Sequence, residues 1–287
     1  MKNLADIRHS MKAISETKQI TSAMRLISIS KMQKAIARYE ANQVHFNRVQ
    51  SAMKDILLHS SEVRHSFLEE QREGVPAYIV IAADKGLCGG YNHNVLNYAK
   101  EIIDREPEKM VLTVGQEARV FFQRQKVNVD IEYMHIAQDP SLYSARKLTA
   151  ELTHLYRTSG INRLNIIYTK FVSTFKQVPT MLELLPMTMD HFDNVEIEMQ
   201  YSADMEFVPS AKRVFDMMVP QYILGLVYGS LVQAYASEHC ARMMAMESAT
   251  KSADEMLDKL GIEMNRARQY AITSEISEIV AAMEALE

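Results

Sequence analysis

A glycine-rich run from Asp84 to Asn92 is the segment of this 287-residue chain that comes nearest to a phosphate-binding loop. It has the sequence Asp-Lys-Gly-Leu-Cys-Gly-Gly-Tyr-Asn and follows an apolar stretch, which is where α/β folds place a phosphate loop between a strand and a helix. The run matches neither GxGxxG nor GxxxxGK[ST]. A tight strand-to-helix connection is therefore favoured, and a nucleotide site is the alternative.

Cysteine and histidine add little further chemistry. Cys88 stands near Lys85 in the same run, where a cationic neighbour would favour a reactive thiolate, but a buried structural thiol is more common. The other cysteine is Cys240, and two cysteines form neither a disulfide framework nor a Cys-based metal site. The nine histidines lack HExxH or comparable spacing. We predict no catalytic residue, cofactor or metal, and a reducing cytoplasmic compartment.

A polar cluster near the C-terminus is the second candidate for function. Arginine and glutamine are fork-like donors suited to carboxylates and main-chain carbonyls. The apolar seam there consists only of alanine, so a narrow helix would permit close contact with another surface. The alternative is a solvated face with ion pairs along the helix. The members are Asn265, Arg266, Arg268, Gln269, Thr273, Glu275 and Glu278.

The distribution of glycine and proline indicates what positions these groups. The chain has only 9 Gly and 7 Pro; the first of them are Gly74 and Pro76, and neither type occurs after Gly261. Because both residues disfavour helix interiors, long uninterrupted helices are expected at both ends. With 47% hydrophobic and 24% charged residues, the composition is that of a globular protein.

The first segment has a heptad pattern that changes in its middle. Apolar residues with 3,4 spacing occur at Leu4, Ile7, Met11 and Ile14, and again at Met32, Ala35, Tyr39, Phe46, Val49, Met53 and Ile56. Between these two sets the same register holds Lys18, Thr21, Arg25 and Ser28, while the apolar face moves to Ile20, Ala23, Met24 and Ile27. Either the middle of this helix meets a second partner, or the supercoil contains a stutter.

The middle segment alternates between strand and helix patterns, as in an α/β domain with a largely parallel sheet. Strands are expected at Ala77–Ala83, Met110–Val114, Val129–Met134, Leu164–Phe171 and Met181–Leu185, and an edge or linking strand at Val195–Tyr201. Helices are expected near Asn94–Arg105, Gln116–Gln125 and Ser141–Thr158.

From Ser210 the pattern is helical to the C-terminus. Seam spacing is expected at Ala249, Ala253, Met256 and Leu260, followed by one stutter before Met264. The uncharged stretch Met217–Ser237 is long enough to span a membrane, but its Pro, Gln, Gly and Ser residues favour a buried helix. Helices of about 80 and 110 Å need a packing partner. We therefore predict an α/β fold with two parts. The terminal helices (1–58 and 209–287) form a long antiparallel coiled coil, and the middle of the chain (75–202) forms a Rossmann-like α/β domain.

Charge is distributed unevenly along the chain. The formal net charge is −4, which argues against a general nucleic-acid binder, but residues 1–55 hold ten Lys or Arg against four acids. This local excess of positive charge is either a solvated coiled-coil face or a surface for an acidic partner.

Four segments, in order and essentially from end to end, make the chain similar to the γ subunit family of F-type ATP synthases, the central rotor shaft. They are Ile7-Arg8 with Thr17–Leu26, the loop Asp84–Asn92, the run Glu238–Thr250, and the run Asn265–Ile276. Two departures stand out. Arg25 occupies a position where the family commonly has lysine, and Val280-Ala281-Ala282-Met283 replaces a more usual glycine-containing turn.

The resemblance implies a noncatalytic rotor. One copy would turn inside a hexamer of three α and three β subunits, with ε and the c-ring as further partners, at the cytoplasmic face of a bacterial plasma membrane and without inserting into it. Met24 and Arg25 would meet the acidic moving segment of β that is called its lever. Arg242, Arg268, Gln269, Thr273 and Glu275 would meet its catch loops, and a tip formed by Ile279, Val280, Met283 and Leu286 would turn in an apolar collar. The alternatives are a coiled-coil scaffold with an α/β recognition domain and an enzyme that uses the glycine loop.

Overall fold

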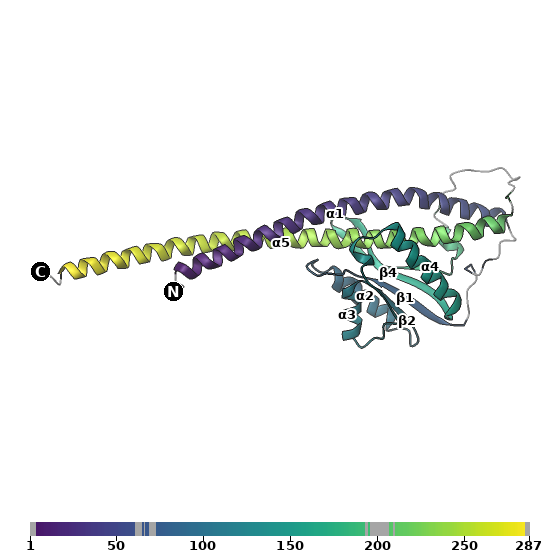
Figure 1. The fold of residues 1–287 in the computed structure, drawn as a ribbon, viewed down its shortest axis with the longest axis horizontal. Coiled ribbons are helices and arrows are strands. Elements are labelled where there is room, and N and C mark those ends of the chain that lie inside the picture. The colour runs from purple at the N-terminus through teal and green to yellow at the C-terminus, as the bar shows by residue number, and fades with distance from the viewer. Residues whose placement is uncertain are drawn as a thin grey trace. The chain divides into compact units, whose positions relative to one another are not determined.

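A computed structural model describes residues 4–60, 65, 67–68, 73–192, 195, 207–208 and 210–284 (Figure 1). The chain forms two compact units. Unit 1 comprises Met1–Ile29 with Arg242–Glu287, and unit 2 comprises Ser30–Ala241. Two long helices contribute to both units: α1 spans Leu4–His59 and α5 spans Ala211–Glu284. The predicted terminal helices are thus present, with Pro220 inside α5.

Unit 2 contains a five-stranded sheet in the order β3-β2-β1-β4-β5. The strands are β1 (Val75–Ile81), β2 (Met110–Val114), β3 (Ile131–Tyr133), β4 (Ile161–Ser173) and β5 (Lys176–Leu185). β1 pairs in parallel with β2 and β4, and β2 pairs in parallel with β3, whereas β4 and β5 form an antiparallel pair. The prediction of a largely parallel sheet is confirmed. The edge or linking strand expected at 195–201 lies outside the described residues except for Val195.

Helices cover both faces of this sheet (Figure 1). The helices between the strands are α2 (Tyr91–Ile103), α3 (Gln116–Arg124) and α4 (Leu142–Thr158), with short 3₁₀ helices at Ile136–Gln138 and Met189–Phe192. In β1, Ile79 and Ile81 pack with residues of α1, α4 and α5, while Tyr78 and Val80 pack with α2 and α3. Both faces of the strand are buried because its side chains alternate between two layers of helices.

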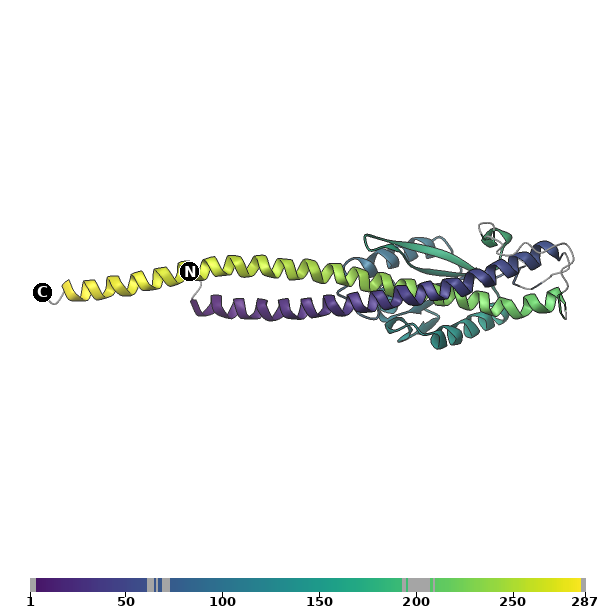
Figure 2. The same ribbon diagram turned by 90° about the horizontal axis from the view of Figure 1, so that it is seen from above.

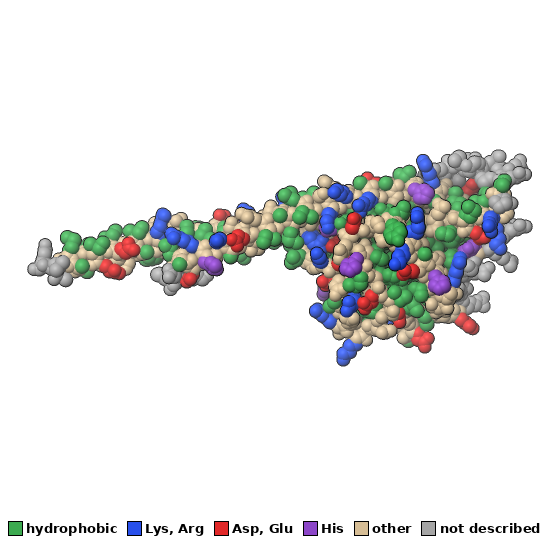
Figure 3. All heavy atoms as spheres, viewed as in Figure 1, with side chains coloured by type: hydrophobic (Ala, Val, Ile, Leu, Met, Phe, Trp, Pro, Cys, Tyr) green, Lys and Arg blue, Asp and Glu red, His purple; other side chains and the backbone are tan. Residues whose placement is uncertain are grey.

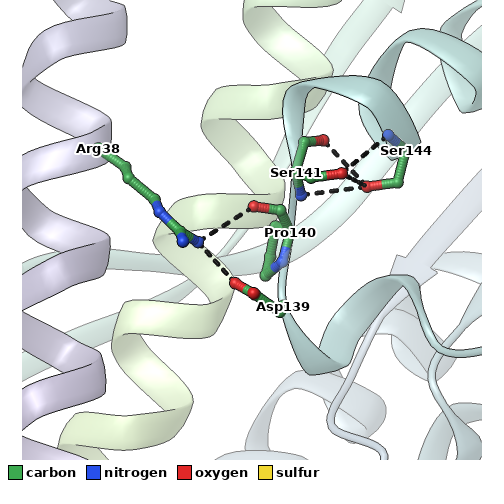
Figure 4. Close-up of polar contacts among 5 residues, drawn as sticks. All are labelled: Arg38, Asp139, Pro140, Ser141 and Ser144. Carbon is green, nitrogen blue, oxygen red and sulfur yellow. Dashed lines mark hydrogen bonds and ion pairs between the residues drawn. The ribbon is translucent and has the colours of Figure 1, made fainter.

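Helix α4 begins with a reciprocal cap (Figure 4). The Ser141 hydroxyl accepts a hydrogen bond from the Ser144 backbone N–H at 3.1 Å, and the Ser144 hydroxyl accepts one from the Ser141 N–H at 3.1 Å. Two N–H groups at the helix end are thereby satisfied. This cap fixes the start of α4, which in the sequence was expected at Ser141.

In unit 2, large side chains and close backbone approach join α1 to α5. The rings of Phe46 and Tyr222 stack with centroids 5.5 Å apart, and Asn42 donates a hydrogen bond to the Gly225 carbonyl at 3.4 Å. A Cβ at Gly225 would lie 2.3 Å from Phe46 Cδ2, so only glycine lets the Phe46 ring lie this close to the backbone. The pairing brings later residues of α1 against earlier residues of α5, which is antiparallel, as predicted.

The uncharged part of α5 packs within unit 2. By length and composition α5 could cross a membrane, and 44% of its most apolar window is buried inside the protein. Phe215, Val219, Tyr222 and Ile223 are all at most 2% exposed and belong to the core cluster under the sheet. This burial supports the interpretation of the stretch as a core helix.

The expected seam of α5 is wrong at Met256, which is 53% exposed. The covered positions include Met246, Thr250, Ala253, Leu257, Leu260, Met264 and Ala267, which keep an uninterrupted 4,3 alternation, and the expected position Ala249 is partly covered as well. The expected stutter between Leu260 and Met264 therefore does not exist. Met256 and Leu257 are adjacent and both apolar, and the 4,3 spacing of the covered positions selects Leu257.

Candidate functional site

The polar positions in the middle of α1 face its partner helix in unit 1. Lys18 forms an ion pair with Asp254, and the Thr21 and Thr250 hydroxyls lie 2.9 Å apart. Ser28 is 1% exposed and donates to the Met24 carbonyl at 2.8 Å. The heptad register thus continues without a stutter through this part of α1, because polar contacts replace apolar ones.

The displaced apolar residues consequently point outward. Ile20, Leu26 and Ile27 are 61%, 57% and 56% exposed, while Met24 and Arg25 are half-buried. Ile20, Met24 and Ile27 follow 4,3 spacing along one side of the helix. Leu26 was not in the expected set; it lies beside that stripe and adds to the same exposed surface. The helix therefore has a polar inner face and an apolar outer face, the reverse of a helix that packs only on its partner.

Part of the basic excess of α1 is compensated inside unit 1. The facing part of α5 carries Asp254, Glu255, Asp258 and Glu263, and Lys18 pairs with the first of them. The side chains of Lys18 and Asp254 remain 39% and 50% exposed, so water screens this pair strongly. The hypothesis of a solvated coiled-coil face with ion pairs thus fits Lys18. The hypothesis of a surface for an acidic partner stays a prediction.

Four of the five residues expected at the catch loops lie together on an exposed helix. Arg268, Gln269, Thr273 and Glu275 are all exposed, and so is every described side chain from Arg268 to Met283. Figures 1 and 2 both show this end of α5 continuing beyond the N-terminal end of α1. The Thr273 hydroxyl donates to the Gln269 carbonyl at 2.9 Å, within the helix. The whole circumference of this segment is therefore available for contacts with other chains.

Arg242, the fifth residue, is in a different environment. It is 7% exposed and interacts within the chain. Twenty-six residues separate it from Arg268, which corresponds to about 39 Å of helix. The structure therefore does not bring Arg242 together with the other four.

The expected tip is apolar and exposed as far as the structure describes it. Ile279, Val280 and Met283 are 61%, 48% and 65% exposed, and Leu286 lies outside the described residues. Two further large side chains on the same segment, Ile272 and Ile276, are 50% and 56% exposed. Exposed apolar side chains in such a continuous run mark an interaction surface.

Polar groups of the glycine-rich loop form hydrogen bonds within the loop and to its neighbours, although Asp84 Oδ2 is buried without a hydrogen-bond partner in the described part of the chain. Asn92 Oδ1 accepts from the Ala83 N–H at 3.0 Å, and Asp84 Oδ1 accepts from the Gln116 N–H at 2.9 Å. Cys88 is buried, and Asn92 Nδ2 lies 3.4 Å from its sulfur. Gly89 has φ +56°, a left-handed conformation that suits glycine. This geometry is that of a tight connection, which supports the favoured hypothesis for the run.

Both cysteines of the chain, Cys88 and Cys240, are buried. Within the described parts of the chain, no three His, Cys, Asp or Glu side chains are grouped so that they could hold a metal ion. Burial raises the pKa of the Cys240 thiol, which disfavours the thiolate. The exposed polar and apolar side chains of unit 1 form the candidate functional site, and they suit contact with other chains.

Solved structures with a similar fold come from mitochondrial ATP synthases. A chain of the Euglena gracilis ATP synthase, in an OSCP/F1/c-ring structure, superimposes with a TM-score of 0.70 at 15% identity, covering 99% of this chain and 94% of its own length. A chain of the Tetrahymena thermophila central stalk and c-ring has a TM-score of 0.61 at 21% identity, covering 80% of this chain and 99% of its own. At these identities the comparison shows a shared fold.

Sequence comparison is more specific. The family model described as ATP synthase matches residues 3–286. The ATP synthase gamma chain of Ruminiclostridium cellulolyticum is 40% identical over 99% of both chains. The sodium ion specific ATP synthase gamma chain of Acetobacterium woodii is 34% identical, also over 99% of both chains. This chain belongs to the ATP synthase gamma chain family.

Proposed function

We propose that this chain is the noncatalytic rotor of an F1Fo ATP synthase and couples ion flow across the membrane to ATP synthesis and hydrolysis. The observation that carries the proposal is the segment of α5 from Arg268 to Met283, which is exposed on every side. A helix of this kind gains stability mainly from packing, so a surrounding partner is expected to supply it. The proposed partner is the cavity of a hexamer of α and β subunits, and membership of the ATP synthase gamma chain family supports it.

The outer face of α1 is the proposed contact with the β lever. Met24 and Arg25 are half-buried and stand beside the exposed Ile20 and Ile27. A positive charge next to an apolar stripe suits contact with an acidic lever that slides over the surface of α1. The opposite charges attract each other, and the two surfaces need not interlock deeply. Arginine at position 25 keeps the charge that lysine would supply and adds fork-shaped donors.

The polar cluster of α5 is the proposed contact with the β catch loops. Arg268 and Gln269 offer planar donors, and Thr273 and Glu275 lie one to two turns further along the same exposed helix. Arg242 belongs to the proposed set through the family resemblance, and its burial limits the surface it presents. The tip around Ile279 and Met283 is proposed to turn in an apolar collar.

The chain would supply no catalytic group of its own. Rotation would present different faces of unit 1 to each of three catalytic sites, and differential contact is how binding at distant sites is coupled. Further proposed partners are ε and the c-ring, with one copy of the chain per complex. The proposed location is the cytoplasmic face of the bacterial plasma membrane, as a peripheral protein.

Subunit counting tests this function directly. The rotor hypothesis predicts copurification of one copy with three α and three β chains, measured by native mass spectrometry of the complex isolated through a tag on β. A homodimer of this chain without α and β would instead support the scaffold alternative. Turnover of ATP by the purified chain alone would support the enzyme alternative.

A paired substitution tests the catch contact. Changing Arg268→Ala together with Gln269→Ala is expected to lower ATP-driven ion pumping per ATP hydrolysed several-fold, because these donors hold the shaft against β. The matched control changes Gln123→Ala with Arg124→Ala, an exposed pair of the same composition near the end of α3. Equal coupling ratios in the two double variants would contradict the proposed role.

A further inference from the structure

An open cavity of about 930 Å³ lies within unit 2 where α1, α4 and α5 meet. This volume is near the upper end of the range for ligand sites in proteins. On α4 the lining includes Arg146, Ala150, His154 and Arg157, which repeat every three or four residues. This periodicity places them along one face of the helix, so the cavity is a groove that follows α4 for about 16 Å.

The walls of this groove are basic. Its lining contains Arg38 and His45 from α1, and Arg146, His154 and Arg157 from α4, and none of the lining residues in the described part of the chain is Asp or Glu. Seen from the side of Figure 1, the space-filling view shows Lys, Arg and His side chains, and also Asp and Glu side chains, among hydrophobic surface in this unit (Figure 3). An occupant that carries negative charge is favoured by complementarity.

The arginines differ in how firmly they are held. Arg38 Nη1 donates to Asp139 Oδ1 at 2.6 Å and to the Pro140 carbonyl at 3.4 Å, which ties α1 to the loop before α4 (Figure 4). Arg157 lies over the Phe67 ring, 4.8 Å from its centroid. Arg146 is exposed, and its side chain forms no hydrogen bond, ion pair or cation–π contact with the described part of the chain. Arg146 is therefore the arginine of this groove that is best able to bind a carboxylate of another molecule.

The floor of the groove is defined as the apolar part of its lining, which comes from α4 and α5. Leu142 and Ala150 line the groove from α4, and Leu224, Gly225 and Tyr228 line it from α5. Leu142 is 47% exposed although it is large and apolar. An apolar floor between basic walls is suited to an amphipathic occupant rather than to a compact anion.

The positions of the charges distinguish between two amphipathic occupants. Arg38 binds Asp139, just before α4 begins, so Arg38 and Arg146 lie toward the start of α4. His154 and Arg157 lie toward its end. A lipid has a single anionic headgroup, so its apolar tail would lie against the cations at the other end of the groove. A helix with carboxylates along both edges of an apolar stripe would match the groove over its full length.

We propose that this groove docks an amphipathic helix of about three turns, with aspartate or glutamate on both sides of its apolar stripe, from another protein. The proposal does not depend on the rotor function, because it uses only contacts within unit 2. It adds a recognition site to the α/β part of the chain, separate from the exposed faces of unit 1.

Binding to the purified full chain tests the chemistry. The probe is a fluorescein-labelled synthetic helix of 15 residues with Leu on one face and Glu on the others, followed by fluorescence anisotropy. The matched probes are a scrambled peptide of the same composition and a peptide with Lys in place of Glu. Binding of the Glu helix that is several-fold tighter than that of both matched probes supports the proposal. Equal binding of the scrambled peptide would overturn it.

Variants locate the binding. Arg146→Glu is expected to weaken binding of the Glu helix by about fivefold, and Ala150→Trp, which fills the groove without changing its charge, is expected to weaken it more than Arg146→Glu does. Arg124→Glu, at an exposed position on α3 outside the groove, is the matched control. An affinity of the Arg146→Glu chain equal to that of the control would overturn the proposal, and so would full displacement of the helix by laurate.

Cross-linking in the assembled complex identifies the occupant. A benzophenone amino acid in place of Ala150 is expected to cross-link to a helical segment of a different subunit that is rich in Asp and Glu, identified by mass spectrometry. Cross-links only to lipid, only to a second copy of this chain, or to a segment that is not helical would each overturn the proposal.

Discussion

The helices α1 and α5 pair in both compact units, but the pairing is constructed differently in each. In unit 2 it rests on aromatic stacking of Phe46 with Tyr222 and on close approach at Gly225. In unit 1 polar contacts, such as Thr21 with Thr250, interrupt a seam that also buries Ile7 and Met246, and large apolar side chains such as Ile20 and Ile27 face outward. Unit 2 therefore buries these large apolar side chains in its own core, whereas unit 1 leaves several of them exposed for contact with other chains.

The largest expected effect comes from the aromatic pairing of unit 2. Phe46→Ala removes a ring that is 8% exposed and leaves a cavity beside Tyr222, so the free energy of unfolding is expected to fall by about 3–5 kcal/mol. Ile27→Ala removes a side chain that is 56% exposed and is expected to change it by less than about 0.5 kcal/mol. Urea denaturation followed by circular dichroism measures both. Similar losses in the two variants would contradict the division between the units.

Three glycines within α5 sharpen the same comparison. Gly225→Ala is expected to destabilise by about 1–3 kcal/mol, because the new Cβ would lie 2.3 Å from Phe46 Cδ2. Gly229→Ala places its Cβ no nearer than 3.7 Å to Tyr39, and Gly261→Ala, in unit 1, meets nothing within 4 Å. Both are expected to stabilise by about 0.5–1 kcal/mol, since alanine favours helix. A stabilising Gly225→Ala would show that the close approach to Phe46 is not required.

The heptad and strand patterns predicted the elements of both units to within a few residues, with β5 the main exception. This strand was expected only over 181–185 and begins at Lys176. Lys176, Gln177 and Pro179 do not resemble a strand, yet they pair with the polar end of β4. Proline lacks a backbone N–H, and it is tolerated here because β5 is an edge strand. On an edge strand, the N–H groups that face away from the sheet form no hydrogen bond to a neighbouring strand. That position in the sheet is a property of the tertiary fold and is not encoded locally.

The candidate site was predictable where it depends on one helix and unpredictable where it depends on two. The outward stripe of Ile20 and Ile27 followed from heptad counting alone. The burial of Arg242 and the exposure of Met256 depend on which face of α5 meets a neighbour. The pattern of α5 offers apolar residues at both 256 and 257, and the expected seam used Met256 at the cost of a stutter, whereas Leu257 keeps the 4,3 spacing.

Alkaline pH is expected to weaken unit 2 through Tyr222. Burial raises the pKa of Tyr222 to about 12, whereas an unfolded tyrosine titrates near 10. Because the folded pKa is higher, the associated stability is fully present below pH 10 and is lost as pH rises through 12, by about 1–3 kcal/mol. Urea denaturation at pH 8 and pH 11 measures this decline, and Tyr222→Phe is expected to reduce it. An equal decline in the variant would assign the alkaline sensitivity to other groups.

The smallest expected effect concerns the ion pair of unit 1. Lys18 and Asp254 are paired but 39% and 50% exposed, so a double-mutant cycle with Lys18→Ala and Asp254→Ala is expected to give a coupling energy of about 0.2–1 kcal/mol. Raising the salt concentration from 0.05 to about 0.5 M should reduce it further, because screening acts on exposed charges. A coupling above about 2 kcal/mol would mean that polar contacts hold unit 1 as firmly as aromatic packing holds unit 2. A weak coupling would fit a segment in which these two helices orient each other while most of its apolar surface remains available to partners.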